Sequence, residues 1–178
     1  TGVIRHVTAD FILPAAKLAE EIPGTPIQVT WSRKEDMRHV WYRPGAICHY
    51  SAKLKDGRIT ALNGKMASTS PSAPMIKLAT GFDLAPADPT ITEGSHDQPY
   101  DIENFLIRGY VPQLGIPVGF WRSVGGSQNG FFHESVIDEL GHEAGEDPLE
   151  FRLKHIRPEH EPAAKVLETV AEMSNWTV

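Results

Sequence analysis

The sequence predicts an α+β fold, in which a small mixed or antiparallel sheet packs against helices. Three patterns lead to this prediction: apolar residues at helical spacing near the start, alternating strand-like segments in the first half, and capped helical segments after residue 125. The chain has 178 residues, of which 40% are hydrophobic and 22% are charged. This composition is typical of a globular domain with a core of ordinary size.

The first expected element is a helix over residues 8–21, capped by Thr8 or Asp10. Its apolar positions recur at steps of three and four residues: Phe11, Ala15, Leu18 and Ile22. A Pro-Gly pair at residues 23–24 ends this helix. Residues 32–36 then turn the chain, either irregularly or as a short capped helix.

Four strands are expected. Residues 27–31 alternate apolar and polar side chains, and a further strand is expected over residues 105–111. Two others are expected over residues 46–54 and 58–67. The Asp-Gly pair at residues 56–57 separates them and is a strong hairpin signal, because this pair adopts positive φ readily.

The middle of the chain, residues 68–99, is rich in Pro, Ser, Thr, Gly and Asp. We expect it to be mostly irregular, with one or two helical turns over residues 75–79. The chain is therefore interpreted as one domain in three parts. Residues 1–67 form a helix with strands and a hairpin, residues 68–99 form the irregular segment, and residues 100–178 form a strand, a glycine-rich turn and the last helices.

Three helices are expected after the glycine-rich turn. The first ends at Gly145, the second is capped by Asp147 and runs to about residue 156, and the third covers residues 162–174. The apolar face of the first helix is predicted to consist of Phe131, Val136, Leu140 and Ala144.

The charged side chains of these helices are expected to lie on the surface. Glu134, Asp138 and Glu139 are interpreted as a solvated or subunit-facing stripe rather than as an acid–base pair. Surface ion pairs worth little each are expected between two arginines and two carboxylates: Arg152 and Arg157 with Asp147 and Glu150.

Composition and missing motifs disfavour several classes of protein. The net charge is −6, with 17 Lys and Arg against 23 Asp and Glu, and no basic cluster suits nucleic acid. Cys48 is the single cysteine and is interpreted as a small buried residue in a strand, so no disulfide or thiolate metal site is expected. The histidines are scattered, and no apolar run reaches the roughly 20 residues of a membrane span. Nucleotide-binding glycine motifs and a nucleophile elbow are also missing, which disfavours a nucleotidase, a dinucleotide-binding enzyme and an unrelated hydrolase.

The most informative segment is the glycine-rich turn at residues 119–130, just before a helix start. Free backbone N–H groups and the positive end of the helix dipole suit an anion there. Arg122 adds a forked donor and Gln128 adds an amide that donates and accepts. The alternative is a structural glycine turn in which Arg122 is paired with a nearby carboxylate.

Residues 121–156 contain, in order, an aromatic-Arg-x-x-Gly-x-x-Gln turn, a Glu-Ser-x-Ile-Asp-Glu helix and an Asp-Pro-x-Glu-x-Arg turn. Residues 27–37 and 39–44 add further matching segments. This series resembles the molybdopterin-binding large subunits of the xanthine dehydrogenase and aldehyde oxidase family, with the closest likeness to the beta subunits of isoquinoline 1-oxidoreductases. The resemblance implies an internal fragment of such a subunit, within its molybdenum-cofactor-binding domain.

The resemblance also implies site residues. In the family, the arginine at the position of Arg122 contacts molybdopterin. Gly125 and Gly126 allow the backbone to approach the cofactor, and Gln128 lies just beyond. Val124 stands where xanthine-specific members present an aromatic ring to the substrate. No arginine lies in residues 86–97, where those members carry a substrate-binding one, so a purine substrate is disfavoured.

Two family features are missing from the sequence. Only residues 1–4 stand where the family has a second glycine-rich loop, and the catalytic glutamate belongs to a stretch that this chain lacks. We therefore assign no catalytic residue and no metal ligand. The expected cofactor is molybdopterin, in its cytosine dinucleotide form, with molybdenum held by the dithiolene of the cofactor.

Two functions remain open. The first is one wall of a molybdenum hydroxylase site that oxidises N-heteroaromatics or aldehydes with water as the oxygen source. The rest of the large subunit completes this site, and a small 2Fe–2S subunit receives the electrons. The second is a stand-alone binding or scaffold domain that has lost the cofactor. The isolated chain is expected to be inactive. Family analogy suggests the periplasm, with the cytoplasm as the alternative.

Overall fold

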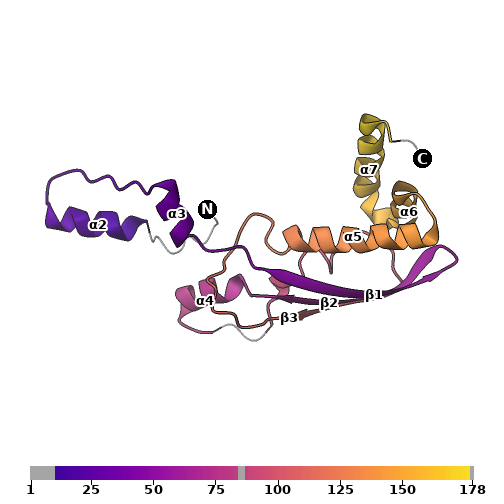
Figure 1. Ribbon diagram of the computed structural model, residues 1–178, viewed down its shortest axis with the longest axis horizontal. Coiled ribbons are helices and arrows are strands. Elements are labelled where there is room, and N and C mark those ends of the chain that lie inside the picture. The colour runs from indigo at the N-terminus through magenta and orange to yellow at the C-terminus, as the bar shows by residue number, and fades with distance from the viewer. Residues whose placement is uncertain (1–10, 84–86, 177–178) are drawn as a thin grey trace.

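The computed structural model describes residues 11–83 and 87–176. Within these ranges the helices are α2 (Ile12–Glu21), α3 (Arg33–His39), α4 (Ser72–Thr80), α5 (Gly126–Ala144), α6 (Pro148–His155) and α7 (Glu161–Ser174). The strands are β1 (Ala46–Lys55), β2 (Arg58–Ser68) and β3 (Asn104–Tyr110), with 3-10 turns η1 (Pro89–Ile91) and η2 (Pro158–His160). Figure 1 shows α5 lying along the sheet, α7 standing away from it, and α2 and α3 extending to one side. The α+β prediction is confirmed.

The sheet is mixed and has the order β1-β2-β3. β1 and β2 form an antiparallel hairpin, whose turn residues Asp56 and Gly57 have φ of 52° and 68°. This left-handed pair is the geometry that a two-residue hairpin turn needs. β3 runs parallel to β2, so the chain crosses over between them through α4 and η1. The strands predicted over residues 46–54, 58–67 and 105–111 are confirmed within one residue or two.

One face of the sheet packs against α5 and α6 and forms a small core. Its buried apolar side chains are Ile59, Leu62, Tyr100, Ile102, Ile137 and Phe151. Gly141 lets the two helices approach closely, because a Cβ at this position would lie only 3.3 Å from the Phe151 ring. The core therefore fixes α5 against the sheet, and with it the turn that precedes α5.

The opposite face of the sheet is exposed in the part of the chain that the structure describes. Ile47 of β1 is 71% exposed, and Leu106 and Tyr110 of β3 are each 50% exposed. Lys65 and Arg108 lie side by side on the same face. An uncovered sheet face with large apolar side chains is typical of a surface that meets another domain or subunit.

The N-terminal part of the described chain forms an arm away from the core. The helix predicted over residues 8–21 is observed as α2, and the caps predicted at Thr8 and Asp10 lie outside the described residues. The strand predicted over residues 27–31 is wrong, because this segment belongs to no strand of the sheet. Figure 1 shows the chain after α2 running back beside that helix, far from any strand that could pair with it. Alternation alone does not make a strand without a partner for its hydrogen bonds.

The predicted helix boundaries with local signals are confirmed. Ser32 caps α3 by accepting a hydrogen bond from the Glu35 N–H at 3.2 Å, so the short capped helix is the form that residues 32–36 take. Gly145 ends α5 with a left-handed φ of 69°. The third predicted helix, residues 162–174, is observed as α7.

The middle segment is more ordered than predicted. α4 covers nine residues where one or two turns were expected over residues 75–79. Beyond it, Asp88 is 5% exposed and gathers the hydroxyls of Ser70, Ser72 and Thr90. The hydroxyl-rich composition that suggests a loop is therefore satisfied internally by one buried carboxylate.

The predicted apolar face of α5 is wrong in part. Phe131 is 70% exposed, whereas Val136, Leu140 and Ala144 pack at the edge of the core. The fully buried positions follow steps of four residues: Asn129, His133, Ile137 and Gly141. Two of them are polar, so a search for apolar periodicity does not find this face.

Candidate functional site: the turn before α5

The segment that enters α5 is a strained turn. Ser123 has φ of 68° and Val124 has φ of 43°, which places two successive non-glycine residues in the left-handed region. A β-branched residue there is a genuine outlier, and such strain persists only where the surroundings hold it. The Val124 N–H donates to the Trp121 carbonyl at 2.9 Å and closes the turn.

Arg43 holds one side of this turn. Its Nη1 and Nη2 both donate to the Arg122 carbonyl at 3.2 Å, and Nη1 also donates to Ser127 Oγ at 2.8 Å. Its guanidinium lies 5.7 Å from the centre of the Trp121 ring, and the indole N–H of Trp121 donates to the Trp41 carbonyl at 2.8 Å. The sequence analysis did not identify Arg43, although it lies in a segment that carries the family resemblance.

The predicted site residues Gly125 and Gly126 have different surroundings. A Cβ at Gly125 would overlap the Thr90 carbonyl oxygen, so only glycine fits. A Cβ at Gly126 would meet no atom within 4 Å, so this side of the turn is open. Gly125 therefore meets another part of the same chain, whereas Gly126 leaves room for an external group.

The other predicted residues present unused donors and acceptors. Arg122 is exposed, and its guanidinium makes no hydrogen bond or ion pair with the described residues, so the local carboxylate of the alternative interpretation is not found. Gln128 Oε1 is buried and lacks a partner among the same residues. The first N–H groups of α5, at Gly126, Ser127 and Gln128, have no backbone acceptor there either. Val124, the predicted substrate-side residue, is half-buried at the strained position.

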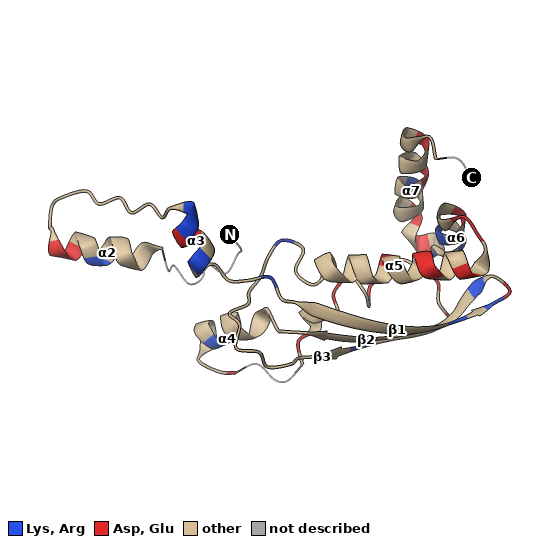
Figure 2. Ribbon diagram, in the orientation of Figure 1, with Lys and Arg blue, Asp and Glu red and all other residues tan. Residues whose placement is uncertain are grey.

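The charge around the turn is positive. Figure 2 shows blue segments at the turn and at the linker that carries Arg43, whereas much of the red lies at the opposite end of α5 and on α6. Two arginines and a helix N-terminus fit an anionic group, and the unpaired Gln128 Oε1 can accept from a polar N–H edge of the same group. The turn is thus suited to an anionic ligand that also carries N–H donors.

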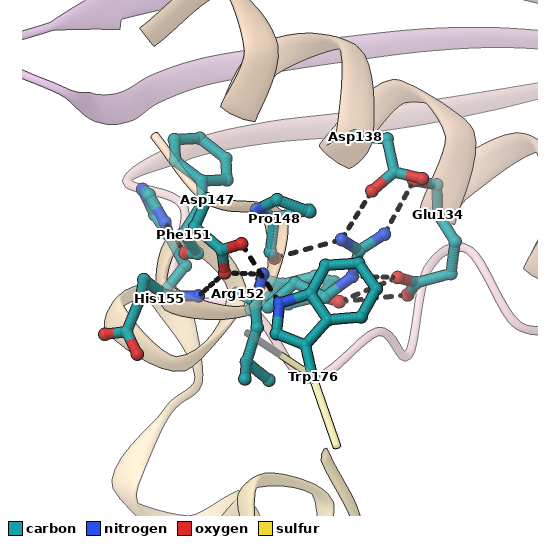
Figure 3. A network of polar contacts seen from close by, with 11 residues as sticks. Glu134, Asp138, Asp147, Pro148, Phe151, Arg152, His155 and Trp176 are labelled. Carbon is teal, nitrogen blue, oxygen red and sulfur yellow. Dashed lines mark hydrogen bonds and ion pairs between the residues drawn. The ribbon is translucent and has the colours of Figure 1, made fainter. Parts of the chain in front are cut away.

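A second polar cluster lies at the far end of α5 and corrects the predicted surface ion pairs. Arg152 Nε donates to Glu134 Oε2 at 2.9 Å, and Arg152 Nη1 donates to Asp138 Oδ1 at 2.6 Å. Figure 3 shows the Arg152 guanidinium between these two carboxylates. The Tyr100 hydroxyl also donates to Glu134 at 2.9 Å. Asp138 and Glu139 are exposed, as a solvated stripe predicts, but Glu134 and Asp138 are also tied to α6 through Arg152.

The partners predicted for Arg152 and Arg157 are also wrong. Asp147 caps α6 by accepting from the Leu149 and Glu150 N–H groups at 2.9 and 3.1 Å, as predicted, and it also accepts from the Trp176 indole. Arg157 donates through Nε to the Tyr100 carbonyl at 2.9 Å instead of pairing with an acid. This cluster joins α5 and α6 and the segment that carries Tyr100.

Two histidines, His133 and His155, are buried in the core. The Ile59 N–H donates to His155 Nε2 at 3.0 Å, so the neutral ring carries its proton on Nδ1, which donates to the Phe151 carbonyl at 2.7 Å. Burial lowers the pKa of His155, and burial likewise lowers the pKa of His133. Among the described residues, no group of three or more His, Cys, Asp or Glu could hold a metal ion. Cys48 lies half-buried in β1, where burial raises the pKa of its thiol.

The fold and the turn define a small α+β domain that offers unpaired donors to an anionic group. The chain belongs to the molybdopterin cofactor-binding domain family, whose model matches residues 7–156. The family predicted from the sequence is thus confirmed. None of the described helices is long and apolar enough to cross a membrane.

Three curated relatives are similar along most of the chain. The beta subunit of isoquinoline 1-oxidoreductase from Brevundimonas diminuta is 30% identical over 98% of this chain and 22% of its own length. A nicotinate dehydrogenase subunit from Pseudomonas putida is 28% identical over 94% of this chain and 14% of its own length. Membrane-bound aldehyde dehydrogenase (pyrroloquinoline-quinone) of Gluconacetobacter polyoxogenes is 26% identical over 86% of this chain and 20% of its own length. The chain thus spans between 14% and 22% of the length of these relatives.

Proposed function

We propose that this chain forms one wall of the molybdopterin site in a molybdenum hydroxylase subunit. The observation that carries the proposal is the unpaired Arg122 guanidinium at the glycine-rich turn. An arginine guanidinium without a partner among the described residues, next to helix N–H groups that also lack an acceptor there, is suited to an anionic ligand from outside the chain. The family match over residues 7–156 supports molybdopterin as that ligand.

Each residue of the turn has a stated role in this proposal. Arg122 binds the phosphate or the polar edge of the pterin, and the unpaired Gln128 Oε1 accepts from an N–H group of the pterin. Gly126 leaves space for the cofactor to approach the backbone. When bound, molybdopterin supplies the molybdenum centre and its redox chemistry. Val124 limits the substrate side with a small apolar side chain.

The remaining parts of the site lie beyond this chain in the proposal. The rest of a larger subunit completes the cofactor cradle and supplies the general base, and a small 2Fe–2S subunit receives the electrons. We expect the cytosine dinucleotide form of the cofactor, and an N-heteroaromatic or aldehyde substrate hydroxylated with water as the oxygen source. The relatives whose names specify isoquinoline, nicotinate and aldehyde support this substrate range. Folded export to the periplasm is the expected location, and the cytoplasm is the alternative.

A scaffold domain without cofactor is the second candidate. It is favoured by Gly125, because the Thr90 carbonyl next to it already explains why a glycine stands there. A domain that has lost the cofactor would keep this packing glycine. Loss of the cofactor would not explain why Arg122 has no partner among the described residues.

The test compares cofactor content in the full-length subunit that carries this chain, produced with its cofactor-maturation machinery. We expect about one molybdenum and one pterin per wild-type subunit, measured by elemental mass spectrometry and by fluorescence of the oxidised pterin. Arg122→Ala should lower this occupancy by about tenfold at limiting cofactor, because charge-assisted hydrogen bonds are lost. Arg33→Ala is the matched control, since its side chain is 86% exposed in α3.

Two outcomes would decide against the proposal. Wild-type subunit without molybdenum would favour the scaffold, and equal occupancy in Arg122→Ala and the wild type would remove Arg122 from the site. The isolated chain is expected to retain little or no molybdenum. It spans at most 22% of the length of the three relatives, so most of the cofactor site would lie outside it. Stable retention by the isolated chain would show that no further wall is needed.

A further inference from the structure

The segment from Asp88 to Gln98 lies directly behind the turn. The Thr90 carbonyl occupies the space where a Cβ of Gly125 would stand. Gly94, with a left-handed φ of 84°, makes a second close approach: its Cβ would lie 2.9 Å from the Gly126 Cα. The two backbones therefore touch without side chains between them. Any shift of one backbone moves the other.

Asn129 fastens these two backbones together. It is fully buried, and its Nδ2 donates to the Ile91 carbonyl at 2.7 Å and to the Glu93 carbonyl at 2.8 Å. Its own N–H donates to the Gly125 carbonyl at 3.0 Å. Both amide protons are thus used inside the protein. Asn129 has no side-chain donor left for a ligand.

Asp88 fixes the first residues of the Asp88–Gln98 segment. Its Oδ1 accepts from the Thr90 N–H at 2.9 Å and from Thr90 Oγ1 at 2.6 Å. Its Oδ2 accepts from Ser70 Oγ and from the Ser72 N–H. Burial alone raises the pKa of a carboxyl, but the hydroxyl and amide donors around Asp88 outweigh it and hold its pKa below the usual value. Asp88 therefore stays charged and keeps Thr90 in one position.

The turn needs such a support because it is strained. Ser123 and Val124 both have positive φ, which is unfavourable for non-glycine residues. Arg43 restrains the turn at the Arg122 carbonyl, and the Thr90 carbonyl restrains it at Gly125. Arg122 lies at the first of these points, and Ser123 and Val124 lie between them. The backbone that carries the Arg122 side chain is consequently restrained at both ends of the strained pair.

We propose that Asn129 is a positioning residue for the cofactor turn, which holds the Asp88–Gln98 segment against Gly125 and thereby sets the direction of Arg122. This inference rests on the proposed function for its ligand, but its structural part concerns the apo protein. The role proposed for Asn129 requires no contact with the cofactor. It acts through the backbone carbonyls of Ile91 and Glu93.

The test uses Asn129→Asp in the full-length subunit, with hydrogen–deuterium exchange of the apo protein as the first readout. Aspartate keeps the shape of the side chain but removes both donors and faces two carbonyl oxygens. We expect the two hydrogen-bonded amides at the turn, those of Val124 and Asn129, to exchange about tenfold faster, while amides of β2 keep their wild-type rates. Asn104→Asp is the matched control, because Asn104 Nδ2 also donates to a backbone carbonyl, that of Thr60, at 2.9 Å in the sheet. The control should leave the turn unchanged.

Cofactor content is the second readout, and it separates this inference from the proposed function. We expect Asn129→Asp to lower molybdenum and pterin occupancy, and Asn104→Asp to leave both at the wild-type level. If Arg122→Ala keeps its cofactor but Asn129→Asp loosens the turn, the proposed function fails and the positioning role stands. If Arg122→Ala loses cofactor but exchange in Asn129→Asp is unchanged, the positioning role is overturned.

A milder variant keeps the test decisive if Asn129→Asp does not fold. Thr90→Val removes the hydroxyl that donates to Asp88 and preserves side-chain shape. It should accelerate exchange at the amides of Val124 and Asn129 in the same direction. Faster exchange spread evenly over β2 and the turn would instead mean a purely structural role and would overturn the proposal.

Discussion

An arginine lies near each end of α5, Arg122 before its N-terminus and Arg152 on the adjoining α6, but the two have opposite surroundings. At the C-terminal end, Arg152 is 12% exposed and donates to Glu134, Asp138 and the Pro148 carbonyl. At the N-terminal end, Arg122 is exposed and has no partner among the described residues. The backbone differs in the same way, because Gly145 supplies the left-handed residue at one end and Val124 is forced into it at the other.

This difference separates architecture from binding. An arginine whose donors are filled internally joins α5 to α6 and has little left for a ligand. The backbone carbonyl of Arg122 accepts from Arg43, and the Arg122 guanidinium has no partner among the described residues. This arginine is therefore available to bind an external acceptor. The turn holds its strained conformation because Arg43 and the Thr90 carbonyl restrain it, and not because its residues favour that conformation.

The largest expected effect comes from filling the space behind the turn. Gly125→Ala places a methyl group on the Thr90 carbonyl oxygen, which is backbone and cannot move aside. We expect a loss of roughly 3 kcal/mol in the free energy of unfolding, measured by urea denaturation. Gly126→Ala is the matched control, because its Cβ meets no atom within 4 Å. It should be neutral or stabilise by about 0.5 kcal/mol. Equal losses in both variants would contradict the close approach at Thr90.

The second prediction compares the stability of two alanine variants, one for each arginine. Arg152→Ala should lower the free energy of unfolding by roughly 2 kcal/mol, because it removes the donor to Asp138 and the Pro148 carbonyl and leaves Glu134 with Tyr100 alone. Arg122→Ala should change it by less than about 0.5 kcal/mol. Thermal denaturation of both variants measures the contrast. A comparable loss in Arg122→Ala would mean that Arg122 is a structural residue and would remove the distinction between the two ends.

The smallest expected effect comes from mild acid. The pKa of His155 is lowered in the folded state by burial, so the unfolded chain takes up its proton first as pH falls below about 6.5. Stability is therefore fully present above that pH and declines below it, by at most about 1.4 kcal/mol per pH unit for one histidine. Protonation also removes the acceptor for the Ile59 N–H. Hydrogen exchange at pH 5 should rise around Ile59 and α6 before it rises at the hydrogen-bonded amides of Val124 and Asn129. His155→Gln should reduce this pH dependence, and His133, whose pKa burial also lowers, accounts for the remainder; an unchanged profile would assign the whole effect to other groups.

Much of the fold could be predicted because its signals are local. The Asp56–Gly57 hairpin, the Asp147 cap and the Gly145 helix end each depend on the conformation of one or two residues, and all three are observed. The turn with Arg122 and Gln128 was also predicted, since glycines before a helix and a nearby arginine form a short contiguous motif. Its proposed contacts with a cofactor remain a prediction.

The supports of that turn were not predictable from the same signals. Arg43 contacts a carbonyl 79 residues further along the chain, and Asn129 contacts carbonyls 36 and 38 residues before it. No local pattern distinguishes Asn129 from a solvent-exposed helical asparagine. Only the steps of four to His133 and Ile137 place it on the buried face, and two of these three residues are polar.

Local backbone preference is enough to specify the class of fold, the hairpin, the helix ends and the position of the turn, and all of these can be read from the sequence. Which faces are buried and which charges are paired depends instead on contacts between distant segments. Residues 27–31 alternate like a strand yet lie outside the sheet, because a strand forms only where a partner backbone accepts and donates its hydrogen bonds. Glu134 and Asp138 resemble a solvated stripe yet bind Arg152, because the path of the chain through Gly145 brings α6 beside α5.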